Sequence, residues 1–163
     1  MLSSVIRDLH TTSVNADVAE IPTATDFVDQ FAAAFGIDPL VSQMINVVLV
    51  DALSNIIAYG YDDAGGHQIT LEFEMGSERL DLVVTDDGRA RDLRSQPMPD
   101  TTADREESEI AGLTTALLRR CTDGVSYRRH DEKNILTLSF RLDRLPEQRE
   151  NRGMSAATGP SDR

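Results

Sequence analysis

Three short segments of this sequence carry residue types that could act on a nucleotide or a phosphate group. The first holds Asp51 and Asn55, which are four residues apart in an apolar helical pattern, so both side chains would project from one face of a helix. An Asn buried in such a helix needs a partner, because its amide competes for backbone hydrogen bonds. That partner is either Mg²⁺, which takes few protein ligands beside phosphate oxygens, or another helix through a hydrogen bond. Taken alone, this segment favours the hydrogen bond.

The other two segments place glycine beside a candidate ligand contact. Asp86 follows an apolar strand pattern, and its carboxylate could accept a hydrogen bond from an adenine amino group, while Gly88 would let the backbone turn close to the ligand. A plain Asp-Gly turn gives the same residues. Gly112, Leu113 and Thr114 begin a helical pattern after a long polar loop, where backbone N–H groups attract phosphate. An ordinary helix start explains them equally well.

Helical and strand patterns alternate along the chain and predict the elements that position these residues. Apolar residues at spacings of three and four indicate helices over about 21–35, 39–59 and 109–121. Alternating apolar residues indicate strands over about 10–14, 69–73, 80–84, 125–127 and 136–142, with a turn at 131–134 between the last two. Residues 89–108 form a polar loop longer than most connections, which is typical of a lid or of disordered chain.

These elements predict an α/β (α+β) two-layer sandwich, in which helices pack on one face of a mixed, mostly antiparallel sheet. The domain would span residues 9–144. An uncertain leader, residues 1–8, would precede it, and a polar tail, residues 145–163, would follow as disordered chain.

The composition narrows the function classes. The 163 residues include 28 Asp and Glu against 16 Lys and Arg, and the resulting net charge of −12 excludes a nucleic-acid partner. An acidic surface suits a basic protein partner or serves solubility alone. The single cysteine, Cys121, fits a reducing cytoplasm, and no stretch predicts a membrane span or a signal peptide. The three histidines are scattered and predict no metal site made wholly of protein ligands.

Taken together, the three segments resemble the histidine-kinase/Hsp90-like ATPase fold, a Bergerat-type ATP-binding fold. Within it they resemble the anti-sigma-factor serine/threonine kinases of bacterial partner-switching systems. The resemblance covers about residues 10–143. Its most specific stretch is DALSNIIAYGY (51–61), and VSYRRHD (125–131) followed by NILTL (134–138) is similar to the closing hairpin of the family.

This resemblance implies a regulator that binds Mg²⁺ and ATP, phosphorylates an anti-anti-sigma (STAS-domain) protein and sequesters a sigma factor. It implies that Asn55 ligates Mg²⁺, that Asp86 contacts adenine, and that Asp51 occupies the position of the catalytic glutamate. It further implies that Gly88, Gly112, Leu113 and Thr114 shape the nucleotide pocket under a lid at 89–108. A homodimer is expected in the same way, with the apolar first helix as its candidate surface.

Three positions or segments depart from the family pattern. Asp51 is one methylene shorter than glutamate, and a misplacement of about 1 Å lowers a rate by about 100-fold, so we expect slowed phosphoryl transfer. Thr114 replaces a second glycine and would crowd the phosphates. The lid arginines Arg89 and Arg91 either hold ATP or are exposed loop charges. The alternative function is therefore a docking module of the same fold that acts by protein binding without ATP.

Overall fold

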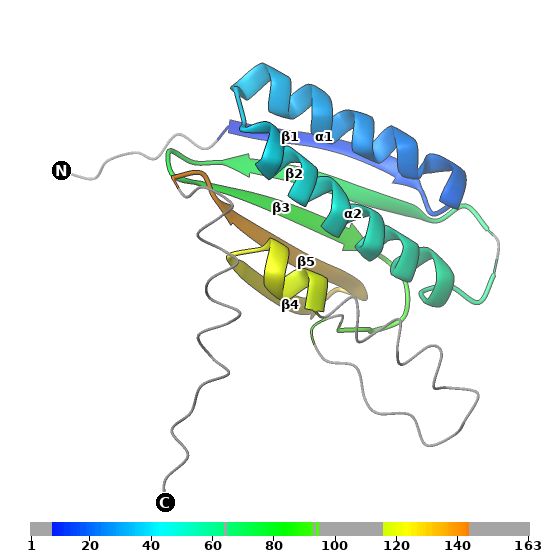
Figure 1. The fold of residues 1–163 in the computed structure, drawn as a ribbon. Helices are drawn as coiled ribbons and strands as arrows, with labels where there is room; N and C mark the ends of the chain where they lie inside the picture. The colour runs from blue at the N-terminus through cyan, green and yellow to red at the C-terminus, as the bar shows by residue number, and fades with distance from the viewer. Residues whose placement is uncertain (1–7, 64, 93, 95–115, 144–163) are drawn as a thin grey trace, which may run out of the picture.

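A five-stranded sheet and a layer of helices make up the fold in the computed structural model, which describes residues 8–63, 65–92, 94 and 116–143 (Figure 1). The tail at 145–163 and the phosphate-binding candidates Gly112, Leu113 and Thr114 lie outside the described residues. In chain order the elements are β1 (Asp8–Asn15), η1 (Val18–Glu20), α1 (Ile21–Phe35), α2 (Pro39–Tyr59), β2 (Gln68–Met75), β3 (Arg79–Asp86), β4 (Gly124–His130) and β5 (Lys133–Arg141).

The two long helices begin and end where the sequence predicts. Pro22 lies in the first turn of α1, and Gly36 ends that helix in the left-handed conformation with a φ of 63°. Asp38 caps α2, because its side chain accepts a hydrogen bond of 2.8 Å from the backbone N–H of Leu40. A helical segment, 116–121, lies in the predicted third helix, whose remainder is outside the described residues.

α2 is apolar on most of its surface because one side packs on the sheet and another contacts α1 beside it. By length and composition it could cross a membrane, with a mean hydropathy of 1.7 over 18 residues, but half of that window is buried in the fold. Buried helices of globular domains pass the same test. Its inward residues Ile45, Leu49 and Leu53 belong to the core, which accounts for the hydropathy.

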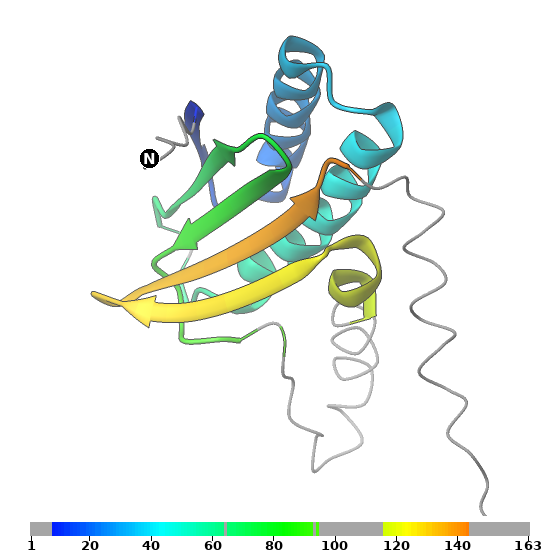
Figure 2. The same cartoon turned by 90° about the vertical axis from the view of Figure 1, so that its left-hand side faces the viewer.

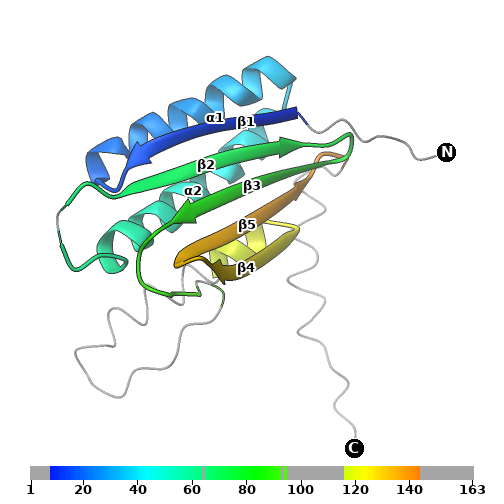
Figure 3. The same cartoon turned by 180° about the vertical axis from the view of Figure 1, so that it is seen from behind.

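The strands lie in the order β1-β2-β3-β5-β4, and each pairing is antiparallel. Apolar residues alternate along β2, β3 and β5 toward the helices, which cover one face of the sheet (Figure 2). Seen from behind, no described helix covers the other face (Figure 3). The register places Asp86, at the end of β3, opposite Asn134 near the start of β5.

Each strand extends beyond its predicted residues at one or both ends, and two of these differences change the predicted leader and turn. β1 extends over Asp8–Asn15 rather than 10–14, because its backbone pairs with β2 along its whole length, so Asp8 is not part of a leader. The β4–β5 turn consists of Asp131 and Glu132 alone rather than 131–134. Both have positive φ, 48° and 61°, as a two-residue turn that matches the strand twist requires.

Aromatic rings fix α1 on the sheet. Phe31 stacks on Phe73 of β2 with ring centroids 4.4 Å apart, and Phe27 stacks on the same ring at 5.6 Å. His10 of β1 packs edge-on against Phe31 and Phe35 at 5.3 and 5.0 Å. His10 therefore has a packing role, far from the candidate site at the end of β3.

Candidate functional site

Asp86 is a buried carboxylate at the end of β3. The residue is only 5% exposed. Its Oδ1 accepts hydrogen bonds from the backbone N–H of Gly88 (2.8 Å) and from Asn134 Nδ2 (2.9 Å). Burial raises the pKa of Asp86 above its ordinary value, and these two hydrogen bonds oppose that shift. Among the described residues no hydrogen bond ends on Oδ2. One oxygen is thus fixed by the protein, and the other can accept a hydrogen bond from a ligand amino group.

A network from the β4–β5 hairpin holds the Asn134 amide in place. Its Oδ1 accepts hydrogen bonds from the Tyr127 hydroxyl (2.7 Å) and from Arg129 Nη1 (2.8 Å), and its Nδ2 also donates to the carbonyl of Arg89 (2.8 Å). Arg129 Nη1 donates in addition to the carbonyl of Gly88 at 3.0 Å. Asn134 is 5% exposed, so the orientation of Asp86 is set by a chain of buried polar contacts.

Sequence reasoning assigned no role to Asn134, Tyr127 or Arg129, although it noted the hairpin that carries them. The alternation of buried and exposed residues along β3 and β5 could have indicated Asn134. Asn134 continues the buried series Leu136, Leu138 and Phe140 by two residues, as Asp86 continues the buried series of β3. A polar residue that extends a buried face needs a partner, and here the two polar residues are partners of each other.

Gly88 brings the chain after β3 against the end of α2. A Cβ at this position would lie 2.8 Å from the Gly60 carbonyl oxygen and 2.9 Å from Asp86 Oδ1, and both distances are too short for real contacts. The next residue completes the junction, because the backbone N–H of Arg89 donates to that same carbonyl at 2.8 Å. Glycine is therefore required at 88 by the approach of the two backbones.

The described cavity beside Asp86 is small. It has a volume of about 20 Å³, which holds about one water molecule and not an adenine ring. Residues from α2, β3, the following segment and both strands of the hairpin line it: Ile56, Gly60, Asp86, Arg89, Arg91, Tyr127, Asn134 and Leu136. The donor and acceptor groups suit the amino end of adenine, but the described cavity is too small for the ring.

Contacts of the two lid arginines explain why the segment 89–91 lies over the cavity. Arg89 forms an ion pair with Asp62 in the loop after α2. The Arg91 guanidinium lies over the Tyr59 ring, 4.4 Å from its centroid, in a cation–π contact with the last turn of α2. Both arginines thus bind the segment 89–91 to the end of α2.

Asp51 and Asn55 lie one turn apart on α2, and Asn55 immediately precedes Ile56, which lines the cavity. Asn55 is 4% exposed, and its Nδ2 donates to the backbone carbonyl of Asp51 at 2.9 Å. This bond lies within one helix and uses one of the two N–H groups of the amide. That bond occupies the nitrogen end of the amide, and a metal would take the oxygen end. Neither residue lines the Asp86 cavity, so the structure brings the predicted site residues together as two pairs on adjoining elements.

His67 connects the loop after α2 to the residue that follows Asp86. Its Nε2 is 2.7 Å from Asp63 Oδ1, its Nδ1 is 3.2 Å from Asp87 Oδ1, and its ring stacks on Tyr61 at 4.2 Å. The hydrogen bonds to Asp63 and Asp87 raise the pKa of His67 above its ordinary value. Burial, with the charges of Asp86 and Asp87, raises the pKa of the Tyr61 phenol. These contacts join the loop after α2 to the end of β3, and we call the cluster of Asp63, His67 and Asp87 the His67 latch. Within the described chain, no group of three or more side chains could hold a metal ion.

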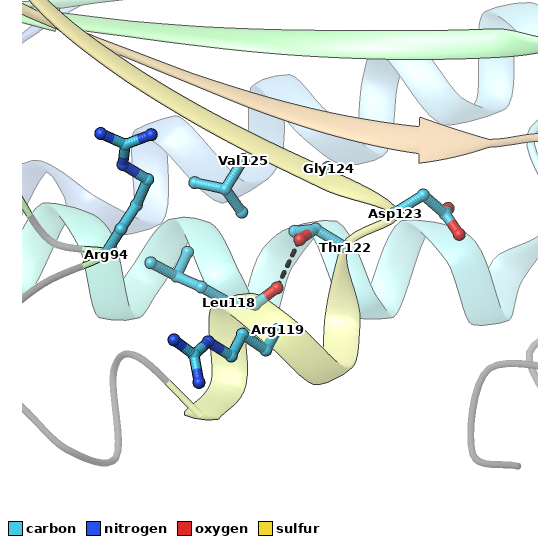
Figure 4. A pocket seen from close by; sticks show the side chains of 7 residues that line it. All are labelled: Arg94, Leu118, Arg119, Thr122, Asp123, Gly124 and Val125. Atoms are coloured by element: carbon cyan, nitrogen blue, oxygen red, sulfur yellow. Dashed lines mark hydrogen bonds between the residues drawn. The ribbon is translucent and has the colours of Figure 1, made fainter. Parts of the chain in front are cut away.

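A larger cavity of about 350 Å³ opens between the 116–121 helix and β4 (Figure 4). Figure 4 shows Arg94 and Arg119 on either side of the apolar Leu118 and Val125, and Arg94 is also hydrogen-bonded to Asp92 through Nε (2.9 Å) and Nη2 (2.7 Å). None of the described residues lines both this cavity and the one at Asp86. Two guanidinium groups suit an anion, so the larger cavity does not match an adenine amino group.

Comparisons with known proteins place the fold in a family. Residues 14–140 match the family model described as the histidine kinase-like ATPase domain. Among solved structures, the histidine kinase domain of the EL346 blue-light activated histidine kinase from Erythrobacter litoralis is similar, with a TM-score of 0.50 and 13% identity. The similarity covers 85% of this chain and 66% of that one, slightly under two thirds of its length, and at this identity it concerns the fold. No curated protein matches the sequence.

Proposed function

Because the chain belongs to the histidine kinase-like ATPase domain family, we propose that it binds ATP with Mg²⁺ and controls a partner protein. In detail we propose an anti-sigma factor of the serine/threonine kinase type, which phosphorylates an anti-anti-sigma (STAS-domain) protein and sequesters a sigma factor. The family match supports nucleotide binding, and the residue pattern DALSNIIAYGY (51–61) supports the finer assignment by resemblance.

Asp86 is the single observation on which nucleotide binding depends most. A carboxylate that is 5% exposed is expensive to bury unless its oxygens have partners. The described residues donate hydrogen bonds to Oδ1 only. An adenine amino group would donate one to Oδ2. The Asn134 network then holds the acceptor in a fixed orientation, so little ordering is needed when the base binds.

The remaining roles are those that the resemblance implies for residues of α2 and for residues 112–114. Asn55 would ligate Mg²⁺ through its amide oxygen, and the metal would neutralise phosphate charge. In the proposed transfer, the γ-phosphoryl group passes to a serine or threonine hydroxyl of the partner, ADP leaves, and Asp51 accepts the hydroxyl proton. Gly112, Leu113 and Thr114 would contact the phosphates. A cytoplasmic location and a homodimer belong to the same proposal.

A docking module without ATP is the second candidate, and one observation favours it. The cavity beside Asp86 holds about 20 Å³, and Arg91 lines it while stacked on Tyr59. A protein that never binds the nucleotide would keep this arrangement permanently. A protein that binds ATP would release the cation–π contact, which at the half-buried Arg91 contributes between about 0.5 and 2 kcal/mol.

Nucleotide selectivity separates the two candidates more sharply than binding alone. The unfolding temperature should be followed with Mg²⁺ and ATP, with Mg²⁺ and GTP, and with Mg²⁺ alone at matched ionic strength. A ligand at 100 times its Kd stabilises the native state by about 2.7 kcal/mol. We expect this for ATP and much less for GTP, because guanine presents a carbonyl oxygen where adenine presents the amino group that Asp86 accepts. Equal absence of any shift with both nucleotides would favour the docking module.

Transfer needs a second experiment with labelled ATP and a candidate STAS-domain protein. We expect label on the partner with the unaltered chain and none with Asn55→Ala. Label that persists in Asn55→Ala would contradict the metal assignment. Binding of the partner without any labelling, together with a normal ATP shift, would show a regulator that is not a kinase.

A further inference from the structure

α1 and α2 lie side by side on the helical face of the molecule (Figure 1), and an open groove of about 590 Å³ runs between them. We call it the α1–α2 groove. It is lined by Asp29, Pro39, Ser42, Gln43, Asn46, Val47 and Val50. None of the described residues lines both this groove and the Asp86 cavity.

The side of α2 that borders this groove carries an exposed apolar stripe. Leu40, Val47 and Val50 are 53%, 42% and 37% exposed, and their spacings of seven and three place them on one side of the helix. Ten residues separate the first from the last, a length of about 15 Å along the helix axis. Packing inside the domain does not explain this stripe, because the opposite side of α2 supplies the core residues.

One acidic side chain lines the groove beside the stripe, and both helices belong to an acidic stretch of the chain. Asp29 stands on the α1 side of the groove, where Asn46 Nδ2 donates to its Oδ1 at 2.8 Å and fixes the carboxylate at the edge. The stretch from Asp8 to Glu78, which contains both helices, has eight Asp, four Glu and no Lys or Arg. Every Lys and Arg of the described residues lies between Arg79 and Arg141. The groove therefore belongs to a wholly acidic part of the chain.

We infer that the α1–α2 groove binds a cationic amphipathic helix of a partner protein. An apolar floor about 15 Å long accepts the apolar side of about three helical turns, and the acidic border pairs with Lys or Arg on the flanks of that helix. A second copy packed symmetrically on the same groove would bring two acidic borders together. Anionic lipid headgroups would be repelled in the same way. This interaction is separate from the nucleotide site and extends beyond the proposed function.

The test uses one synthetic probe and two matched variants. The probe is a fluorescent helical peptide of about 18 residues with Leu at every third or fourth position and Lys on the flanks, and its binding is followed by fluorescence anisotropy. The variants are Val47→Asp in the groove and Val18→Asp on η1, where Val18 is 65% exposed and does not line the groove. Both add the same negative charge at an exposed valine, so both should fold and both should attract Lys equally.

We expect Val47→Asp to weaken peptide binding by about tenfold or more, because a carboxylate would be buried under the apolar side of the peptide. Val18→Asp should bind as the unaltered protein does, and a peptide with Glu in place of Lys should not bind. Equal binding by both variants would mean attraction to acidic charge in general and would overturn the inference.

Two other occupants would also overturn it. A protein that is dimeric in sedimentation, and that Val47→Asp makes monomeric, would use the groove for a second copy. Binding to phosphatidylglycerol vesicles that Val47→Asp abolishes, without peptide binding, would make the groove a membrane surface. All of these measurements are made without nucleotide, so they can be interpreted even if the chain does not bind ATP.

Discussion

At the scale of the residue, the site consists of one buried acid and the amide that orients it. Asp86 and Asn134 come from positions 48 residues apart, and a single 2.9 Å hydrogen bond joins them. The raised pKa of Asp86 means that the folded state holds its proton more tightly than the unfolded state. As the pH rises above 3.8, the ordinary pKa of an aspartate, Asp86 therefore lowers the stability of the folded state. At neutral pH the ionised carboxylate is kept although it destabilises the fold.

The variant Asp86→Asn should separate the effect of the buried charge on stability from its effect on ATP binding. The amide keeps an oxygen for the Gly88 N–H and the Asn134 amide but removes the buried charge, so we expect the free energy of unfolding at pH 7 to change by less than about 1 kcal/mol. ATP affinity should fall by about tenfold or more, because an NH₂ group then faces the adenine amino group. Urea unfolding and calorimetry measure the two effects. An unchanged preference for ATP over GTP would contradict the role of Asp86.

The His67 latch should weaken as the pH rises. A histidine whose folded-state pKa is raised adds stability that is present below about its ordinary value of 6.5 and is lost as the pH passes the folded-state pKa. We expect the NMR titration midpoint of His67 to lie above 6.5. Asp63→Asn should lower it, since the hydrogen bond to Asp63 is the largest cause of the shift. Asp62→Asn is the matched control, because Asp62 pairs with Arg89.

At the scale of the element, the site is the junction of three parts: the end of α2, the end of β3 and the β4–β5 hairpin. The carbonyl of Gly60 accepts from the Arg89 N–H, and the carbonyl of Gly88 accepts from Arg129. The position of Asp86 therefore depends on backbone contacts between elements as well as on its own strand. A change at a backbone contact should disturb the site without touching a predicted ligand residue.

Gly88→Ala tests this dependence. The added Cβ meets the Gly60 carbonyl oxygen at 2.8 Å, so the two backbones must separate, and we expect a loss of about 1–3 kcal/mol in the free energy of unfolding. Gly65→Ala is the matched control, because its Cβ would lie at an ordinary 3.8 Å from Asp63. Chemical denaturation of both variants gives the comparison. A neutral Gly88→Ala would show that the junction is less close than the distances indicate.

The β4–β5 turn offers a change in the opposite direction. Asp131 and Glu132 both have positive φ, which favours Asn and Gly, so replacing the pair with Asn-Gly should raise stability by about 1 kcal/mol. Thermal unfolding measures the gain. Glu78→Gly serves as the control, since Glu78 is not among the residues with positive φ and glycine there only adds freedom to the unfolded chain.

At the scale of the whole molecule, charge is divided between two parts of the fold. The acidic stretch Asp8–Glu78 forms β1, α1, α2 and β2, whereas the described Lys and Arg lie on β3, β4, β5 and the segments between them. Because the strand order is β1-β2-β3-β5-β4, the two parts occupy opposite edges of the sheet. The part that contains β1, β2 and both long helices is therefore acidic throughout, whereas the described Lys and Arg near the opposite edge are mixed with Asp and Glu.

Self-repulsion in the acidic part predicts an effect of salt on stability. Gln30→Lys, on the exposed side of α1, should raise the free energy of unfolding by about 0.3–0.5 kcal/mol at low ionic strength, and the gain should vanish at about 1 M salt. Ser126→Lys on β4, which has Arg128 and Arg129 nearby in sequence, should show no such gain. Urea titrations at the two salt concentrations provide the measurement. Identical salt dependence for both variants would contradict the prediction that repulsion between carboxylates is concentrated in the acidic stretch.

Local periodicity and helix caps were enough to predict the two long helices, the strands and the two-layer fold class, and the motifs resemble the histidine kinase-like ATPase fold to which the family match assigns the chain. The spacing of Asp51 and Asn55, the Asp38 cap and the Gly36 stop are local properties, and the structure confirms the helices they predict. Only the tertiary structure decided which polar groups meet. The pairing of Asp86 with Asn134, the approach of Gly88 to Gly60, the latch at His67 and the apolar groove between α1 and α2 depend on strand register and helix packing. Such contacts join residues far apart in the chain, and local patterns carry no measure of those distances.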